Sequence, residues 1–212
     1  MDMRCWSDLP YDILVLIGKK LTIVDHLSFC AVCKDWRSVS KICCPVQFTT
    51  ESLWLMFLRN PRRRSAQWEI GDPSSGCIYT IDAPLLSART TRCLLSKHGW
   101  LLLISTKPSP SLFFFNPLSQ ARIDLPWCDA FSGLNWDRPK DPSLPVFAIS
   151  SPPTSHDCVV WSVRMLGRVG RYECCMIGRG ENNWKTKRRV NERITGPILH
   201  ALFYEGFFLL EH

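Results

Sequence analysis

Cysteines are the residues of this sequence whose type and spacing come nearest to a chemical site. Cys30 and Cys33 form a C-x-x-C pair, and Cys43 and Cys44 follow it. A zinc site needs four ligands, usually as two well-spaced pairs, and a thioredoxin-like thiol site needs a preceding strand. The pattern around Cys30 and Cys33 is helical, so we interpret these cysteines as packing residues. We expect no metal and no cofactor.

The histidines, glycines and acids add no catalytic motif. The sequence contains no H-E-x-x-H and no G-x-S-x-G, which are the spacings of zinc proteases and serine hydrolases. Gly167 with Gly170, and Gly178 with Gly180, fall between predicted strands without a P-loop lysine, so we interpret them as turn glycines. No two carboxylates share an evident environment. We therefore predict a non-catalytic protein with no catalytic residues.

Two basic clusters could bind nucleic acid. The first is Arg59 with Arg62, Arg63 and Arg64 near Trp68, and the second is Lys185, Lys187, Arg188, Arg189 and Arg193 beside Trp184. Nucleic-acid binding needs exposed aromatic side chains among the basic ones, whereas strand alternation explains Trp184 equally well as an inward-packing residue. The net charge of +7 is modest, and charges also protect strand edges. We expect no nucleic-acid partner, and a basic nucleic-acid-binding module stays an alternative.

Length and composition describe an ordinary globular protein. The 212 residues suffice for one medium domain or two small ones, and 15 prolines with 11 glycines predict many turns. The odd number of cysteines, 11, shows no disulfide-scaffold spacing, and no N-x-S/T sequon occurs. The N-terminus does not resemble a secretory signal, and the longest apolar runs are too short to span a bilayer. We expect a reduced, soluble, intracellular protein, in the nucleus, the cytoplasm or both, with no membrane partner.

Residues 6–37 predict three short helices. Ser7 or Asp8 is the predicted cap of the first helix, and Thr22 is the predicted cap of the second. Apolar residues at helical spacing form one face of the first helix: Ile13, Leu14, Ile17 and Leu21. A further apolar set marks the third helix: Ala31, Val32, Trp36 and Val39. About forty residues cannot bury this many apolar side chains alone, so the helices need the rest of the chain or a partner.

The order W-S-D-L-P-x-D-I-L followed by V-C-K-x-W-R resembles the F-box motif. The matching residues are Leu9, Pro10, Asp12, Leu14, Ile17, Leu21, Asp25, Val32, Cys33, Lys34, Trp36 and Arg37. This resemblance implies docking on a Skp-type adaptor of a cullin–RING ubiquitin ligase. The adaptor-binding residues that it implies are Leu9, Pro10, Leu14, Ile17, Leu21, Val32, Cys33 and Trp36. The alternative is an ordinary three-helix packing unit.

Beyond a segment at residues 51–58 that its period does not classify, the pattern changes to strands. Candidate strands bounded by turn residues lie at 77–81, 92–96, 100–105, 112–116, 121–125, 146–150, 158–164, 172–177, 183–188, 198–203 and 207–210. Residues 127–145 are predicted as a long loop. His98 with Gly99, and residues 204–206, supply similar tight hairpin turns. The strands fall into three sets about fifty residues apart, which is typical of propeller blades; a plain antiparallel sheet or sandwich is the alternative.

Several runs in the chain are similar to a large plant F-box family. They are SLWLMF at 52–57, CLLSKHGWLLL at 93–103, FFFNP at 113–117, RIDLP at 122–126 and NWK at 183–185. The resemblance implies a C-terminal β-rich domain related to kelch-type propellers. Closing a propeller takes about four to eight blades, and about two and a half are present, so we expect an incomplete propeller and a C-terminally truncated product. The predicted fold class is α+β, with an F-box at 3–45, a linker at 46–75 and a propeller-like region at 76–212.

The two resemblances imply a substrate-receptor subunit of an SCF-type (Skp–cullin–F-box) E3 ubiquitin ligase. The alternative function is a basic nucleic-acid-binding or general protein-interaction module without a ligase role. The expected partners are a Skp-type adaptor, through it a cullin, and an unidentified target protein that the β-rich region recruits for ubiquitination. The protein itself would supply proximity as a scaffold, and other subunits would carry out ubiquitin transfer.

Overall fold

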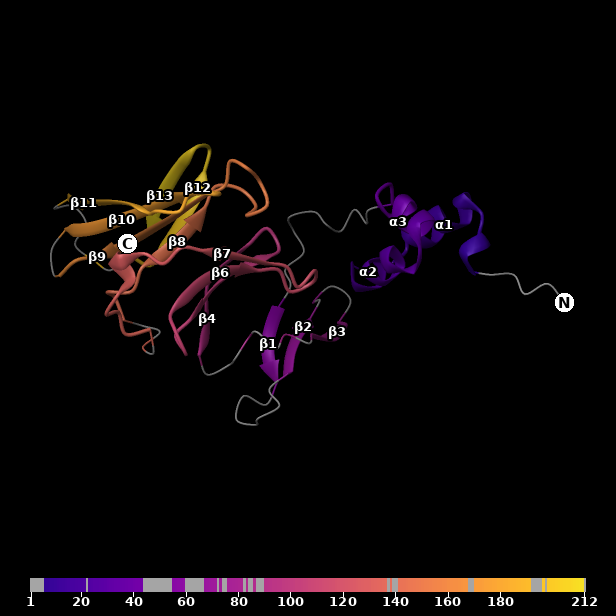
Figure 1. Ribbon diagram of the computed structural model, residues 1–212, viewed down its shortest axis with the longest axis horizontal. Helices are drawn as coiled ribbons and strands as arrows, with labels where there is room; N and C mark the ends of the chain where they lie inside the picture. Colours follow the sequence, from indigo (N-terminus) through magenta and orange to yellow (C-terminus); the bar gives the residue numbers. More distant parts are fainter. Residues whose placement is uncertain are drawn as a thin grey trace. The chain divides into compact units, whose positions relative to one another are not determined.

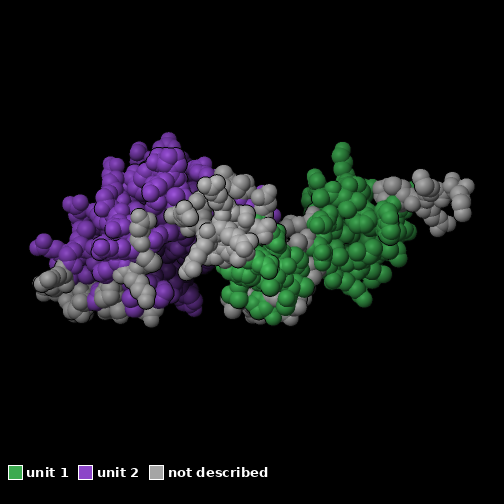
Figure 2. Space-filling view, turned by 90° about the horizontal axis from the view of Figure 1, so that it is seen from below, with its two compact units in different colours: residues 1–59, 68–81 green, residues 60–67, 82–212 purple. Residues whose placement is uncertain are grey.

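The computed structural model describes most of the chain. The described residues are 6–21, 23–43, 55–59, 67–71, 73, 76–81, 83, 86, 90–136, 138, 141–167, 170–191, 196 and 198–211. The chain divides into two compact units, residues 1–59 with 68–81 and residues 60–67 with 82–212 (Figure 2). Helices precede antiparallel sheets, which confirms the predicted α+β fold class. The domain boundaries at 3–45, 46–75 and 76–212 stay predictions.

The first unit begins with short helices (Figure 1). They are the 3-10 helix η1 (Trp6–Asp8) and the α-helices α1 (Tyr11–Gly18), α2 (Ile23–Val32) and α3 (Lys34–Ser40). The cap predicted at Ser7 or Asp8 is wrong for α1, because both residues belong to η1. Pro10 is the N-cap and makes no side-chain cap hydrogen bond, but its carbonyl accepts two backbone N–H groups of α1 at 3.1 Å each. The predicted cap Thr22 lies outside the described residues.

The third helix begins later than the sequence predicts. Ala31 and Val32 end α2 and do not belong to α3. Cys33, between the two helices, has an extended backbone and is the N-cap of α3, so it is not a helical residue. After this break α3 contacts both α1 and α2. Residues 6–43 therefore form one module, which we call the helical module.

A three-stranded sheet follows in the chain. It has the order β1 (Leu55–Arg59), β2 (Gln67–Gly71) and β3 (Ile78–Ile81). β1 coincides with the segment that its sequence period does not classify. Glu69 of β2 is buried, and its carboxylate forms an ion pair with the Arg59 guanidinium of β1 at 3.0 Å. This contact supplies the partner that a buried carboxylate requires.

The second unit contains two four-stranded sheets and a hairpin, which we call the β unit. Their strands are β4 (Thr91–Lys97), β5 (Trp100–Ser105), β6 (Ser111–Phe115) and β7 (Arg122–Leu125); β8 (Val146–Ile149), β9 (Val159–Met165), β10 (Arg171–Gly178) and β11 (Lys185–Val190); and β12 (His200–Tyr204) and β13 (Phe207–Glu211). Neighbours in the chain are neighbours in each sheet, and every pair is antiparallel. These elements confirm the strands predicted from residue 92 onward.

The three groups are arranged like propeller blades. β8 lies beside β4 and also beside β12, so the first strands of successive groups are neighbours, as expected around a propeller axis. The Lys97 ammonium of β4 donates to the carbonyl of Ile149, at the end of β8, at 3.4 Å. That the propeller is of the kelch type stays a prediction.

The two predicted hairpin turns have the same backbone geometry. His98 and Gly99 have φ of 55° and 75°, and Glu205 and Gly206 have φ of 46° and 86°. Two consecutive residues with positive φ match the right-handed twist of the flanking strands. The pair Lys97–Trp100 flanks the first turn, and Tyr204–Phe207 flanks the second. The interpretation of these turns as the same strand-entry turn in different blades is thus confirmed at the level of backbone conformation.

The β7–β8 connection belongs to the core, which the prediction of a plain loop at 127–145 missed. It contains the 3-10 helix η3 (Asp129–Phe131), and Phe131 is 1% exposed. The Phe131 ring centroid lies 5.6 Å from that of Phe147 on β8 and 5.4 Å from that of Trp184, which precedes β11. The core around it also includes Trp100, Leu102, Ile104, Leu112, Phe114, Cys128, Trp136, Ile149, Cys158, Val160, Cys175 and Ile177. Phe131 thereby packs the connection against the second four-stranded sheet, inside a core cluster that contains side chains from both sheets.

The β12–β13 hairpin presents two apolar faces. Phe208 stacks on Trp161 of β9 with ring centroids 4.9 Å apart, and Ala201 and Leu210 pack into the same cluster. The opposite face carries the exposed cross-strand pairs Leu202–Leu209 and Tyr204–Phe207.

Among the described helices of the whole chain, none is both long enough and apolar enough to cross a membrane.

Candidate protein-interaction surface

The helical module has a small core. Its buried apolar side chains, among those described, are Leu14, Phe29, Val39 and Cys43. Gly18 of α1 provides the space for this packing, because a Cβ there would lie 2.9 Å from the Cβ of Cys43. This close approach explains a glycine that helix propensity alone disfavours by about 1 kcal/mol.

An aromatic contact and a hydrogen bond to a backbone carbonyl join α2 and α3. The rings of Phe29 on α2 and Trp36 on α3 lie 4.6 Å apart between centroids. The Arg37 guanidinium donates to the carbonyl of Cys30 at 3.1 Å, and the Ser40 hydroxyl donates to the carbonyl of Arg37 at 2.8 Å. These bonds fix the direction of α3 after the break at Cys33.

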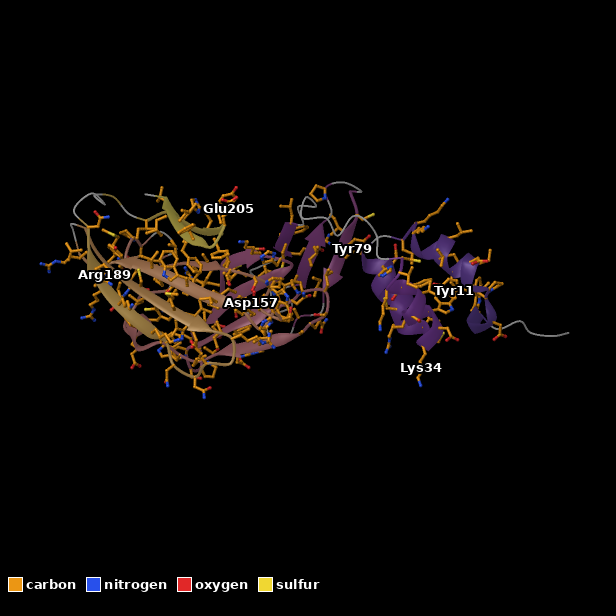
Figure 3. All side chains as sticks on the ribbon, turned by 90° about the horizontal axis from the view of Figure 1, so that it is seen from above. Tyr11, Lys34, Tyr79, Asp157, Arg189 and Glu205 are labelled. Atoms are coloured by element: carbon orange, nitrogen blue, oxygen red, sulfur yellow. The ribbon has the colours of Figure 1, made fainter. Side chains whose placement is uncertain are left out.

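Several large apolar side chains of the module lie outside this core. Tyr11 is 51% exposed, Leu16 is 57% exposed and Val32 is 51% exposed. Ile13 lies one helical turn before Leu16 on the same side of α1 and is also exposed. Figure 3 labels Tyr11 and Lys34 on this module. Several large exposed apolar side chains on so small a module favour a protein-binding surface.

The structure separates the predicted adaptor-binding residues into two groups. Leu9, Leu14, Ile17, Leu21 and Trp36 belong to or pack against the module core. Pro10 and Val32 are exposed, and Cys33 is half-buried. Their role in binding an adaptor stays a prediction.

Sequence reasoning missed other exposed apolar residues of the module. It placed Ile13 on one apolar face with Leu14, Ile17 and Leu21, and it did not consider Tyr11, Leu16 or Ile42 as surface anchors. The signal was available for Leu16, since it lies one turn from Ile13 and off the stripe of Leu14, Ile17 and Leu21.

The described part of the second basic cluster lies on β11. All six side chains of β11 are exposed. Trp184, just before the strand, points inward instead: its Nε1 donates to the carbonyl of Pro126 at 2.7 Å, and its ring contacts Phe131. This confirms the interpretation of Trp184 as a packing residue. Arg62, Arg63, Arg64 and Arg193 lie outside the described residues.

Arg188 of β11 is exposed and pairs with the buried carboxylate of Glu173. Glu173 of β10 is 1% exposed and accepts from Arg164 of β9 at 2.7 Å and from Arg188 at 2.8 Å. Burial raises the pKa of the Glu173 carboxyl, but the hydrogen bonds from Arg188 and Arg164 outweigh it, so the pKa lies below its ordinary value. Glu173 is therefore ionised at neutral pH and acts as a structural anion.

A pocket of about 380 Å³ opens in the β unit. Apolar residues of its lining include Phe114, Ile123 and Val160. Its two carboxylates are engaged: Asp124 pairs with Arg122 at 2.6 Å, and Glu181 pairs with Lys185 at 2.5 Å. The hydrogen bond from Lys185 lowers the pKa of Glu181. A general acid at neutral pH needs the opposite shift, so the pocket favours binding over proton transfer.

The described cysteines are not grouped as metal ligands. Cys30 and Cys33 are half-buried free thiols in the helical module. In the parts of the chain that the structure describes, no three His, Cys, Asp or Glu side chains are grouped closely enough to hold a metal ion.

Comparison with known protein families finds a matching family for the N-terminal region and another for the C-terminal region. The model of the F-box domain matches residues 6–47, which include the helical module, and the model of the KIB1-4 beta-propeller matches residues 70–211. The chain belongs to the plant F-box proteins with a KIB1-4 β-propeller. The helical module is thus its F-box, and the β unit lies in its propeller region. Both parts of the predicted family resemblance are confirmed.

Curated relatives come from Arabidopsis thaliana. The F-box protein At4g00893 is 32% identical over 182 residues, which cover 85% of this chain and 42% of that protein. The F-box protein At4g12382 is 33% identical over 124 residues, which cover 58% of this chain and 83% of that protein. The F-box protein At1g49360 is 28% identical over 205 residues, which cover 92% of this chain and 40% of that protein. The chain therefore spans about two fifths of the length of two of these three relatives. No solved structure matches it significantly.

Proposed function

We propose that this protein is the substrate-receptor subunit of an SCF-type E3 ubiquitin ligase. The observation that carries the proposal is the F-box match, on a module that leaves Tyr11, Leu16 and Val32 exposed around a small core. A few apolar and aromatic anchors supply most of the affinity in interfaces where helices dock. The partner of this surface is a Skp-type adaptor, and the adaptor links the chain to the cullin.

The predicted adaptor-binding residues then act in two ways. Pro10 and Val32 contact the adaptor directly, together with Tyr11, Ile13 and Leu16. Leu14 acts from inside, because its burial holds α1 against α2 and α3. Leu9, Ile17, Leu21, Cys33 and Trp36, which are half-buried, contribute to both.

The propeller region recruits the target protein in this proposal. The chain itself is non-catalytic and raises the effective concentration of the target at the ligase. Support comes from the carboxylates of the β unit, since Glu173 and Glu181 are held ionised in ion pairs and are not available as acids. The reaction takes place in the nucleus or the cytoplasm, where the other ligase subunits are found.

The test is a calorimetric titration of the full chain with a purified Skp-type adaptor. The chain should bind with one-to-one stoichiometry. Leu16→Ala combined with Val32→Ala should weaken binding at least about tenfold, or 1.4 kcal/mol, because both anchors are lost. The unfolding midpoint should not change, because both side chains are exposed.

A matched control uses Val190→Ala on β11, which also removes an exposed apolar side chain. It should leave adaptor affinity unchanged. Leu9→Ala with Pro10→Ala should weaken binding while the β unit stays folded. A folded chain that does not bind the adaptor would refute the ligase function.

A further inference from the structure

Strand β11 is the basic outer edge of the second blade. The sheet has the order β11-β10-β9-β8, so β10 covers one edge of β11, and no described strand pairs with the other. Four of the six residues of β11 are basic and none is acidic: Lys185, Lys187, Arg188 and Arg189 are the basic ones. An edge strand with open backbone groups is a template for a further strand.

The charges of β11 are divided between its two faces. Lys185, Lys187 and Arg189 alternate along the strand, so their side chains lie on one face at a spacing of roughly 6.7 Å. Arg188 lies on the opposite face and is neutralised by Glu173. On the first face, Lys185 pairs with Glu181. Lys187 and Arg189 form no ion pair with any described carboxylate, and Figure 3 labels Arg189 at the edge of the β unit.

We propose that β11 is the docking strand for an extended acidic segment of a partner protein. The segment pairs its backbone with the open edge of β11, as in strand addition to other sheets. Its carboxylates, at every second residue, stand opposite Lys187 and Arg189, where oppositely charged cross-strand pairs are favourable. The identification of this segment with the ubiquitination target rests on the proposed function above.

A protein partner fits this strand better than a nucleic acid does. Binding of single strands relies on aromatic side chains that stack on the bases. β11 contains no aromatic residue, and Trp184 beside it is engaged with Pro126 and Phe131. The open backbone edge has a counterpart in an extended peptide, which supplies amide donors and acceptors.

The first experiment is a fluorescence-anisotropy titration of the full chain with a labelled peptide of alternating glutamate and valine. Binding should weaken when NaCl is raised from about 50 mM to about 300 mM, because exposed charges are screened. The double variant Lys187→Glu with Arg189→Glu should weaken binding at least about tenfold. The control Lys107→Glu with Arg138→Glu makes the same change in net charge at exposed positions outside β11, and it should leave affinity within about twofold. Equal losses in both double variants would overturn the proposal.

Two further probes test the backbone pairing and the class of partner. Alternate N-methylation of the peptide, in each of the two registers, should abolish binding in one register while its charge stays the same. Equal binding of both methylated peptides would overturn the strand pairing. Tighter binding of an oligothymidylate than of the acidic peptide, with the same loss in the β11 double variant, would overturn the protein partner.

Adaptor titrations on the same preparations separate the two proposals. The β11 double variant should bind the Skp-type adaptor like the unmodified chain, since β11 is not part of the F-box. Normal adaptor binding without peptide binding overturns the docking strand alone. Peptide binding without adaptor binding overturns the ligase function and leaves β11 as a docking strand for an acidic protein.

Discussion

The F-box module and the β unit distribute apolar side chains in opposite ways. Among the side chains that the structure describes, the module buries four apolar residues and exposes Tyr11, Ile13, Leu16 and Val32. The main cluster of the β unit instead contains 14 buried residues, including the aromatic rings of Phe114, Phe131 and Trp136. Burial of one large apolar side chain contributes about 1.5–3 kcal/mol. The difference indicates that the β unit gains its stability internally, whereas the module keeps apolar surface for a partner to cover.

The charged side chains sharpen this contrast within the β unit. Glu173 lies in the interior and has two arginine partners. The exposed face of β11, by comparison, carries Lys187 and Arg189 without described carboxylate partners. The charges that stabilise the fold are therefore paired around one buried carboxylate, and the cations available for binding lie on the other face of β11. This separation makes it possible to alter stability and binding with different substitutions.

The largest expected effect is the loss of the Phe131 ring. Phe131→Ala should lower the free energy of unfolding of the β unit by about 3–5 kcal/mol, because it leaves a cavity among Phe147, Trp136 and Trp184. Chemical denaturation monitored by tryptophan fluorescence measures the change. Hydrogen exchange by mass spectrometry should show lost protection in peptides from both four-stranded sheets.

The matched substitution in the helical module is Val32→Ala. It should change stability by less than about 0.5 kcal/mol, since Val32 is exposed and outside the module core. The contrast between the two regions would be refuted if Val32→Ala lowered the free energy of unfolding as much as Phe131→Ala does.

The sequence predicts local features of this fold better than long-range ones. The turn at His98 and Gly99 was predictable because residue chemistry and backbone conformation coincide within two residues. The burial of Phe131 was not, because residues 127–145 have no period and the ring's partners come from β8 and from the residue before β11. The same limit applies to Glu173, whose arginine partners lie on neighbouring strands in a register that only the folded sheet defines.

The F-box illustrates a related limit. Its motif predicts the helical module and the residues that match the family, but it does not predict which of these residues are buried. Leu14 and Val32 are equivalent as motif positions, yet one is 2% exposed and the other is exposed by half. The break at Cys33 decides this difference, because it ends α2 at Val32 and brings α3 back onto the core. Helix periodicity continues through such a break and therefore does not reveal it.

The second prediction tests the buried charge. Glu173→Gln should destabilise the β unit by about 3 kcal/mol at neutral pH, because Arg164, which is 16% exposed, loses its counter-charge. The pKa of Glu173 is lower in the folded state than in the unfolded state. Its contribution is therefore present above the unfolded-state pKa, about 4.3, and is lost as pH falls through the folded-state pKa. Denaturation curves at several pH values should show the difference between variant and unmodified chain shrinking toward acidic pH.

Glu181→Gln is the matched control for this prediction. Glu181 also accepts from a cationic side chain, Lys185, but that ion pair is exposed to solvent. Exposed pairs contribute little, so the unfolding midpoint should stay unchanged at neutral pH. A constant effect of Glu173→Gln from neutral to acidic pH would show that lost packing, and not lost charge, causes it.

The smallest expected effect concerns the reason for glycine in each region. Gly99 is required for its backbone conformation: its φ is 75°, and a Cβ at this position would have no described atom within 4 Å beyond its chain neighbours. Gly18 is required for another reason, because the space beside Cys43 is too small for a Cβ. Gly99→Ala should cost about 1–2 kcal/mol, and Gly99→Asn should cost less, because asparagine tolerates positive φ. At Gly18 the order should reverse, with asparagine worse than alanine, because the larger side chain increases the overlap with Cys43.

The control is Gly196→Ala, at a site with no described atom within 4 Å and no positive φ, and it should not destabilise the chain. Thermal unfolding of these variants gives the order directly, and the same order at Gly18 and Gly99 would refute the distinction.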